Sequence, residues 1–244
     1  MKFYLFEFEK HKKYFQLLIE KYKLNMTENS DEADVIISYG GDGTLLDTFQ
    51  KFPNKTILPI RNYDRCNIHN DNFNFFDTNY INIKPIIDLK FNNKNLFGIS
   101  EMVIRNSNVS KAIRFNLKIN DQIYAENIIG DGIICATSLG ASGYFKSVTN
   151  TIFNDGIGIG FINNTQGMSN LIIDNKSIIE IELIRGNAQL CLDHIEEKLF
   201  EKEKVLFRYS SLGISLVNYK NVFMCPECRN KRHSAYVNTL YKCI

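Results

Sequence analysis

The chain has 244 residues, of which 44% are apolar, and its 29 basic and 27 acidic residues leave a formal net charge of +2 at pH 7. This length can bury one large core or two modest ones, and we expect two domains. A nearly balanced charge argues against nucleic acid or an anionic membrane as the main partner. Residues 1–13 alternate apolar and charged side chains, unlike a signal peptide, and no apolar run is long enough for a membrane-spanning helix. We therefore expect a soluble, cytoplasmic protein.

The N-terminal part of the sequence alternates between strand and helix patterns. Residues 2–9 alternate as a strand does, and residues 14–22 carry apolar side chains at helical spacing. A β-branched apolar run follows at Val35–Ile37, and residues 56–60 predict the next strand. This order is typical of a doubly wound α/β domain with parallel strands, in which ligands bind beyond the carboxyl ends of the strands. We assign residues 1–96 to this domain.

A glycine-rich loop, Gly40-Gly41-Asp42-Gly43-Thr44, joins the second predicted strand to a predicted helix. Its three glycines let backbone amides approach a phosphate at the positive end of the helix. Asp42 would repel that phosphate, so its presence indicates a second task. We interpret Asp42 as a catalytic residue that holds a metal ion or orients a hydroxyl for attack on a phosphoryl group. An ordinary β–α turn in which Asp42 caps the helix remains an alternative.

After about residue 97 the sequence changes to short alternating runs with no long helix between them. The Asn120-Asp121 pair between two such runs indicates a hairpin turn. We predict an all-β, sandwich-like domain over residues 97–220 and a separate tail over residues 221–244, with a hinge at residues 90–98. The predicted strands are residues 99–105, 112–119, 122–126, 178–184, 188–192, 204–209 and 214–217.

A second constellation lies inside this β domain. Gly130-Asp131-Gly132 precedes the apolar run Ile133–Ala136, and a loop of small residues with hydroxyls follows. A flat ring could stack on Tyr144 while Ser142 and Ser147 hydrogen-bond to sugar hydroxyls, and Asp131 could accept from an amide or amine. The alternative is a hairpin turn followed by a Ser-capped helix.

The C-terminal tail contains Cys225-Pro226-Glu227-Cys228, which has the spacing of a zinc knuckle. A closed tetrahedral site needs four ligands, and His233 and Cys243 are the local residues that would complete it. We therefore predict a zinc site at Cys225 and Cys228. The alternative is that these are reduced surface cysteines on a β-hairpin.

These motifs together resemble those of the NAD kinase family. NAD kinases carry the Gly-Gly-Asp-Gly-Thr loop, then an Asn-Glu pair that opens the β domain, then Gly-Asp-Gly, then Thr-Pro-x-Gly-Ser-Thr-Ala-Tyr. The corresponding places here, in the same order, are Gly40–Thr44, Ser100-Glu101, Gly130–Gly132 and Thr137–Tyr144. Further along the chain, Leu190–Asp193 resembles an Asp-containing turn in the later part of NAD kinase sequences. A lipid kinase shares the first motif but would not be expected to carry the other three.

The resemblance covers roughly residues 1–217 and implies the NAD kinase fold. It implies Mg²⁺-assisted transfer of the ATP γ-phosphoryl group to the 2′-hydroxyl of the adenosine ribose of NAD, giving NADP. Asp42 would lie near that hydroxyl. NAD kinases are commonly dimers or tetramers with sites at subunit contacts, which implies a homo-oligomer. The residues implied to bind phosphate are Gly40, Gly41, Gly43 and Thr44, and those implied to bind NAD are Ser100, Glu101, Asp131, Ser142, Tyr144 and Ser147.

Several positions depart from the family pattern. Ser100 replaces the Asn, Ser138 replaces the Pro, and Ala141-Ser142-Gly143 replaces Ser-Thr-Ala. The family has a glycine- and asparagine-bearing loop after its third strand, and this chain has Arg61-Asn62-Tyr63-Asp64 there. Two alternatives therefore stay open. One is a catalytically weak or inactive nucleotide-binding protein of the same fold, and the other is a kinase with a different nucleoside or lipid acceptor.

Overall fold

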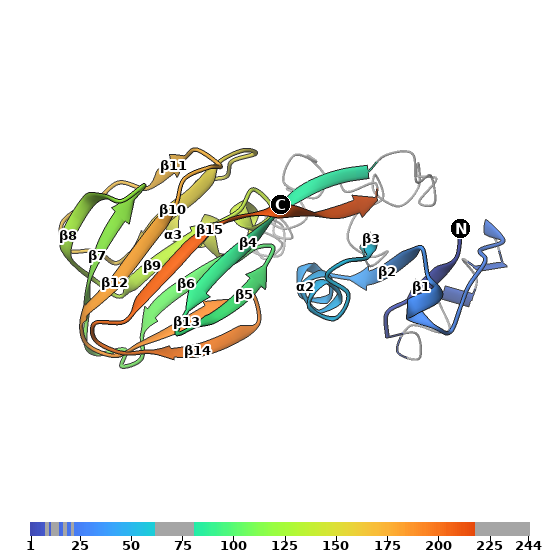
Figure 1. The fold of residues 1–244 in the computed structure, drawn as a ribbon, viewed down its shortest axis with the longest axis horizontal. Coiled ribbons are helices and arrows are strands. Elements are labelled where there is room, and N and C mark those ends of the chain that lie inside the picture. Colours follow the sequence, from blue (N-terminus) through green and yellow to red (C-terminus); the bar gives the residue numbers. More distant parts are fainter. Residues whose placement is uncertain (8–9, 11–14, 17–18, 21, 62–80, 218–244) are drawn as a thin grey trace, which may run out of the picture. The chain divides into compact units, whose positions relative to one another are not determined.

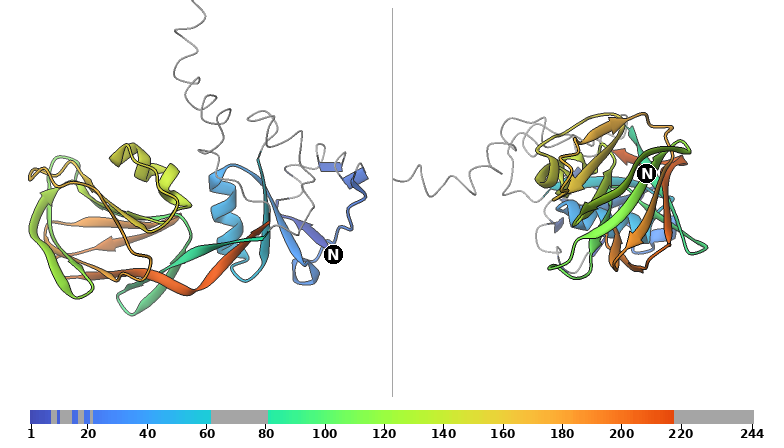
Figure 2. Two further views of the ribbon diagram at one scale, coloured as in Figure 1. Left: turned by 90° about the horizontal axis from the view of Figure 1, so that it is seen from above. Right: turned by 90° about the vertical axis from the view of Figure 1, so that its left-hand side faces the viewer.

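The computed structural model describes residues 1–7, 10, 15–16, 19–20, 22–61 and 81–217. The chain forms two compact units (Figures 1 and 2). Unit 1 comprises Met1–Ile83 and Ile214–Ile244, and unit 2 comprises Lys84–Gly213. The predicted zinc ligands and residues 62–64 of the altered loop lie outside the described residues, as does part of the predicted helix at residues 14–22.

Unit 1 is built on parallel strands. The strands β1 (Phe3–Leu5), β2 (Val35–Gly40) and β3 (Thr56–Arg61) pair in that order, and the end of β15 (Lys204–Val217) pairs in parallel with β3 through Leu216 and Ile57. The helix α2 (Asp42–Lys51) joins β2 to β3, and a short 3₁₀ turn, η1 (Ser30–Glu32), precedes β2. The predicted α/β domain with parallel strands is confirmed.

The apolar residues of unit 1 explain this arrangement. Five of the six residues of β2 are buried, as expected for a strand covered on both faces. In α2 the buried side chains are Leu45, Thr48 and Phe49, which share one helical face. One core cluster comprises Phe3, Leu5, Phe15, Val35, Ile37, Tyr39, Leu58, Ile60 and Val217.

Unit 2 is a sandwich of two sheets. The first runs β8, β7, β12, β15, β4, β5, and the second runs β11, β10, β9, β6, β13, β14. The strands of the first sheet that have not yet been given are β4 (Ile81–Phe91), β5 (Lys94–Gly98), β7 (Ile113–Ile119), β8 (Gln122–Gly130) and β12 (Ile179–Arg185). Those of the second are β6 (Glu101–Asn106), β9 (Gly132–Ala136), β10 (Ile157–Ile162), β11 (Leu171–Ile173), β13 (Ala188–Leu192) and β14 (Ile195–Leu199).

Alternating side chains from both sheets fill the interior of this sandwich. Phe115 and Ile181 from the first sheet and Ile104 and Leu190 from the second belong to the same buried cluster. The sandwich-like prediction is therefore confirmed. The structure differs from the predicted strands in two respects: β15 is continuous where we predicted two runs, and β5, β10, β11, β14 and the part of β4 after Ile83 were not predicted.

A short helical segment packs on the outer face of the second sheet. It consists of the 3₁₀ turn η3 (Gly140–Ser142) and the helix α3 (Tyr144–Thr149), which lies against β9 and β10. Phe145 of α3 contacts Phe153 edge to face with ring centroids 5.3 Å apart. Gly158 of β10 makes room for both rings, because a Cβ there would lie 2.7 Å from Cζ of Phe145 and would overlap Phe153. No helix in the described residues is long and apolar enough to cross a membrane.

We expect Gly158→Ala to lower the free energy of unfolding by about 1–3 kcal/mol, because the added methyl group must displace two buried rings. Denaturant titration measures this. Ile172→Val, at the half-exposed position that pairs with Gly158 on β11, is the control and should change the stability by less than about 0.5 kcal/mol. Equal stability of the two variants would contradict the packing described for α3.

Candidate functional site

The glycine loop of unit 1 leads directly into α2. Gly40 ends β2, Gly41 is the N-cap residue, and Asp42 is the first residue of the helix with its side chain exposed. Asp42 is therefore not the cap that our alternative reading proposed. The first amides of a helix have no intrahelical acceptor and carry its positive end. This loop thus combines hydrogen-bond donors with one exposed carboxylate.

The glycines of the loop serve different purposes. A Cβ on Gly40 would overlap the Thr44 side chain and lie 2.9 Å from Thr44 Cβ, so Gly40 allows the helix to start close to the strand. A Cβ on Gly41 would meet no atom of the described residues within 4 Å. Backbone at Gly41 is consequently open to close approach by a bound group, which a side chain there would obstruct.

Buried hydroxyls attach α2 to β2. Thr48 Oγ1 lies 2.6 Å from the Thr44 carbonyl oxygen and 3.0 Å from Ser38 Oγ, and both hydroxyl side chains are buried. Because a hydroxyl has a single proton, Thr48 donates to the carbonyl and accepts from Ser38. This contact links the strand before the loop to the helix after it, and so restrains Asp42.

In unit 2 the structure brings the Ser100-Glu101 pair against the loop that contains Ser142 and Tyr144. The contact centres on Thr137, which is fully buried. Thr137 Oγ1 donates to the Ile99 carbonyl at 2.7 Å and accepts from the amides of Leu139 at 3.1 Å and Gly140 at 3.2 Å. The Thr137 amide donates to the Ser100 carbonyl at 2.9 Å. One side chain therefore holds together two motifs that are distant in the sequence.

Gly140 allows this contact to be close. A Cβ at Gly140 would overlap the Ser100 carbonyl and would lie 2.8 Å from Ser100 Oγ. The Ser100 side chain, which replaces the family Asn, consequently lies beside the Gly140 backbone. Both positions belong to one compact turn.

Glu101 lies at the N-terminus of α3. Its Oε2 accepts from the Phe145 amide at 3.3 Å, and the N-cap residue Gly143 lies beside it, since a Cβ there would be 3.4 Å from that oxygen. The N-terminus of α3 thus receives a glutamate from β6, and the alternative of a Ser-capped helix is wrong, because the N-cap residue is Gly143. Tyr144 is half-buried against the cluster under α3, and Ser147 is exposed.

Asp193 satisfies the amides on the other side of the same segment. Its carboxylate accepts from the amides of Ile99 at 2.7 Å, Ser100 at 3.0 Å and Glu101 at 3.1 Å. Burial raises the pKa of the Asp193 carboxyl, while these three hydrogen bonds and the nearby His194 act in the opposite direction. Asp193 was noted in the sequence only as part of a turn, and its contacts with Ile99–Glu101 depend on the pairing of β6 with β13.

Asp131 lies at the opposite end of β9 from these residues. The five-residue strand lies between it and Thr137, which places the two residues about 20 Å apart at the usual rise per residue. Its Oδ2 accepts from Asn163 Nδ2 at 2.8 Å and its Oδ1 from Asn106 Nδ2 at 3.3 Å. The chain crosses from one sheet to the other here, and both neighbouring glycines touch backbone atoms of adjacent segments. Unit 2 thus groups Ser100, Glu101, Ser142 and Tyr144, and sets Asp131 apart.

Thr137, Asp193 and Asn163 were not among the predicted site residues. The sequence signals for the first two are the motifs that contain them, Thr137–Tyr144 and Leu190–Asp193. Asn163 has no such signal, since its contact with Asp131 spans 32 positions in the sequence. Within the described residues, no cluster of three or more His, Cys, Asp or Glu side chains is arranged to hold a metal ion.

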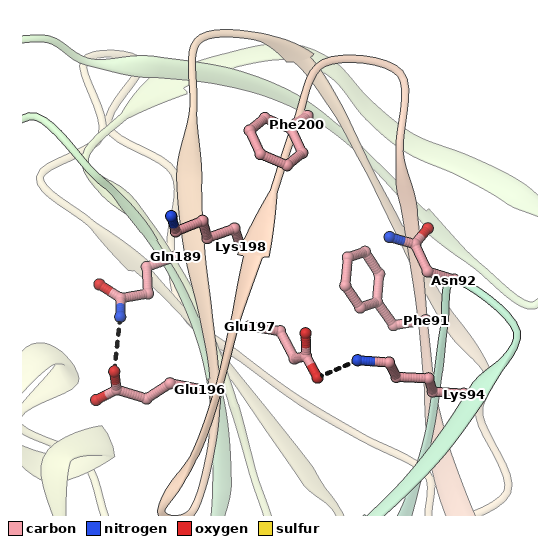
Figure 3. Close-up of a pocket in the computed structure, with 8 residues that line it drawn as sticks. All are labelled: Phe91, Asn92, Lys94, Gln189, Glu196, Glu197, Lys198 and Phe200. Carbon is pink, nitrogen blue, oxygen red and sulfur yellow. Dashed lines mark hydrogen bonds and ion pairs between the residues drawn. The ribbon is translucent and has the colours of Figure 1, made fainter.

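A separate pocket of about 450 Å³ lies between the β4–β5 and β13–β14 hairpins (Figure 3). One ion pair and one hydrogen bond join its lining side chains: Lys94 Nζ lies 2.6 Å from Glu197 Oε1, and Gln189 Nε2 donates to Glu196 Oε2 at 2.8 Å. None of the predicted site residues lines it. The lining residues are Phe91, Asn92, Lys94, Gln189, Glu196, Glu197, Lys198 and Phe200.

Comparison with known proteins agrees with the resemblance seen in the sequence. No family model matches the chain. It is 27% identical to NAD kinase 2 of Oceanobacillus iheyensis over 187 residues, which cover 67% of this chain and 70% of that protein. The crystal structure of an NAD kinase from Archaeoglobus fulgidus in complex with ATP superposes with a TM-score of 0.71 at 16% identity, covering 96% of this chain and 98% of that one. Yeast NADH kinase complexed with NADH gives a TM-score of 0.68 at 15% identity, covering 98% and 87%. The predicted NAD kinase-like fold is confirmed, and the chain is a divergent relative of these kinases.

We expect Thr137→Val to lower the free energy of unfolding by at least about 2 kcal/mol, because it leaves two amides and one carbonyl of a buried turn without their partner. Thr137→Ser keeps the hydroxyl and should cost only about 1 kcal/mol for the lost methyl group. Denaturant titration of both variants measures the difference. A smaller loss for Thr137→Val than for Thr137→Ser would show that the methyl group, and not the hydrogen bonds, makes Thr137 important.

Proposed function

We propose that this divergent relative of the NAD kinases is itself an NAD kinase, which transfers the γ-phosphoryl group of ATP to the 2′-hydroxyl of the adenosine ribose of NAD and forms NADP. The observation that carries the proposal is the exposed Asp42 at the start of α2, within an open glycine loop. It stands in a chain that has the NAD kinase fold and is similar to a curated NAD kinase over two thirds of its length.

In unit 1 the glycine loop would hold the phosphates of ATP. The open backbone at Gly41 and the first amides of α2 offer donors and a positive helix end to phosphate oxygens. The Asp42 carboxylate would accept a hydrogen bond from the 2′-hydroxyl and hold its oxygen ready for attack. Phosphoryl transfer depends mainly on such positioning and on charge neutralisation.

Mg²⁺ fits this loop. The ion usually binds through one or two carboxylates together with substrate phosphates and water, so a single carboxylate such as Asp42 beside a phosphate-binding loop suits it. When bound, it would neutralise phosphate charge during transfer. A dedicated cluster of protein ligands is not needed for this role.

In unit 2 Glu101 and its neighbours would hold NAD. An ionised carboxylate only accepts hydrogen bonds, so Glu101 suits the hydroxyls of a ribose. Tyr144 is half-buried and offers a ring face to a base, and Ser142 lies in the same turn. Ser147, exposed on α3, would contact the dinucleotide further out.

Asp131 would take part from a second copy of the chain. We propose a homo-oligomer, dimer or tetramer, because within one copy Asp131 lies at the opposite end of β9 from Glu101, which pairs with Ala136, and from Thr137, where the loop with Ser142 and Tyr144 begins. A carboxylate held by two asparagines at a corner of the sandwich is available to an amide or amine of a ligand bound to a neighbouring copy. This arrangement would assemble the proposed site without moving any strand.

We expect Asp42→Asn to reduce NADP formation from NAD, ATP and Mg²⁺ by about 100-fold or more while NAD still binds, because the amide is a poorer proton acceptor than the carboxylate. The steady-state rate of NADP formation and calorimetric titration with NAD are the two measurements. Asp47→Asn, an exposed position on the same helix, is the control and should retain full activity.

Other outcomes would favour the alternative functions. Tight binding of NAD without turnover by the natural chain would favour a nucleotide-binding protein of the same fold. Neither binding nor turnover of NAD would favour a kinase with another acceptor. Full activity of Asp42→Asn would remove Asp42 from the mechanism.

The tail carries a further proposal, a structural zinc ion bound by Cys225 and Cys228 with His233 and Cys243. We expect native mass spectrometry of the purified chain to detect a dimer or tetramer with one zinc per subunit, lost on treatment with a chelator. Less than about half an equivalent of zinc would contradict the zinc proposal. A monomer with or without zinc would contradict the oligomer.

A further inference from the structure

The segment Ile99–Glu101 connects β5 to β6 and carries the glutamate that the proposed function assigns to the ribose. All three of its amides donate to one carboxylate, that of Asp193, at 2.7–3.1 Å. One side chain therefore accepts from every backbone amide of this segment.

The position of Asp193 is itself determined by the sandwich. It occupies the two-residue turn between β13 and β14, next to the pair Leu192–Ile195, and its own amide donates to the Glu101 carbonyl at 3.0 Å. Gly98 lies so close that a Cβ there would be 3.0 Å from Asp193 Oδ2. Its backbone has φ +50°, a left-handed conformation that Asp adopts more readily than most residues.

The opposite side of the same segment is held by Thr137. The carbonyls of Ile99 and Ser100 accept from the Thr137 hydroxyl and amide, at 2.7 and 2.9 Å. Amides on one side and carbonyls on the other are thus both satisfied. Glu101 is the residue that leaves this restrained segment, and its carboxylate reaches the Phe145 amide of α3.

We propose that Asp193 is a positioning residue for dinucleotide binding: its carboxylate holds the Ile99–Glu101 backbone so that Glu101 presents its oxygens to the ribose of NAD. This inference rests on the proposed function. Asp193 does not touch the ligand, and it acts through Glu101.

The test compares Asp193→Asn with Asp121→Asn in the full-length chain. Asn keeps the size of Asp but has one acceptor oxygen, and its NH₂ group would face amides that also donate. We expect the KM for NAD to rise about tenfold or more, as the loss of 1–2 kcal/mol of hydrogen bonding implies, with the KM for ATP unchanged. Amide hydrogen exchange at residues 99–101 should become faster. Asp121, another aspartate with positive φ in a two-residue hairpin turn of unit 2, is exposed, and its variant should behave as the natural chain does.

A second variant covers the event that Asp193→Asn does not fold. Asp193→Glu keeps two acceptor oxygens on a longer side chain, and its KM for NAD should lie between those of the natural chain and of a folded Asp193→Asn. A KM for NAD within about twofold of the natural value in either variant, with faster exchange at residues 99–101, would overturn the inference while the proposed function stands. An equal rise in the KM for ATP would also overturn it. Failure of the natural chain to bind NAD would overturn the proposed function, and this inference with it.

Discussion

The backbone of Ile99–Glu101 is hydrogen-bonded on both sides, and the grouping of the unit 2 residues depends on it. Thr137 donates to the carbonyls of Ile99 and Ser100, and the Asp193 carboxylate accepts from all three amides. Three separate parts of the sandwich therefore meet at this short connection. A buried peptide group without a partner is costly, and a connection between strands ordinarily has few partners. Here Thr137 and Asp193 supply these partners, so the backbone of this connection is hydrogen-bonded as the backbone of a strand is.

Both candidate catalytic or binding carboxylates lie at helix N-termini. Asp42 is the first residue of α2, and Glu101 reaches the second residue of α3 from a neighbouring strand. A negative charge is favoured at this end of a helix, so each carboxylate lies where the helix dipole favours it and where it would accept from a ligand hydroxyl. The formal net charge of the chain is only +2, so these two carboxylates would act through their positions at helix N-termini and not through a large net charge.

Close approach of backbone to neighbouring atoms recurs at the predicted motifs. Gly40 lies against Thr44, Gly140 against Ser100, and Gly132 against Ile104, and in each case a Cβ would overlap its neighbour. These glycines explain the motifs in terms of packing as well as of ligand binding. Gly41 differs, because among the described residues a Cβ there would meet nothing within 4 Å, and packing against them gives no reason for a glycine at this position.

The sequence by itself determined the two-part architecture and most of its strands. The buried run before Gly40, the helical spacing after it and the alternation in the β domain follow from local periodicity, and the Asn120-Asp121 turn follows from its residue types. β10 escaped prediction because two of its six residues are glycines, which weaken the strand pattern. Gly158 makes room for the rings of Phe145 and Phe153, and Gly160 makes room for Thr149 and Ile134. The ordered motifs also predicted the relationship to NAD kinases.

Only the tertiary structure decided which motif residues meet. Ser100 and Glu101 join the loop at residues 137–144 because β6 pairs with β9, whereas Asp131 stands at the far end of that strand although it is closer to Thr137 in sequence. The role of Asp193 came from the pairing of β13 with β6, which places it beside a segment more than ninety positions earlier. Local periodicity predicts which face of a single helix or strand is buried, but it does not predict which distant strands pair. These contacts could therefore not be predicted from the sequence.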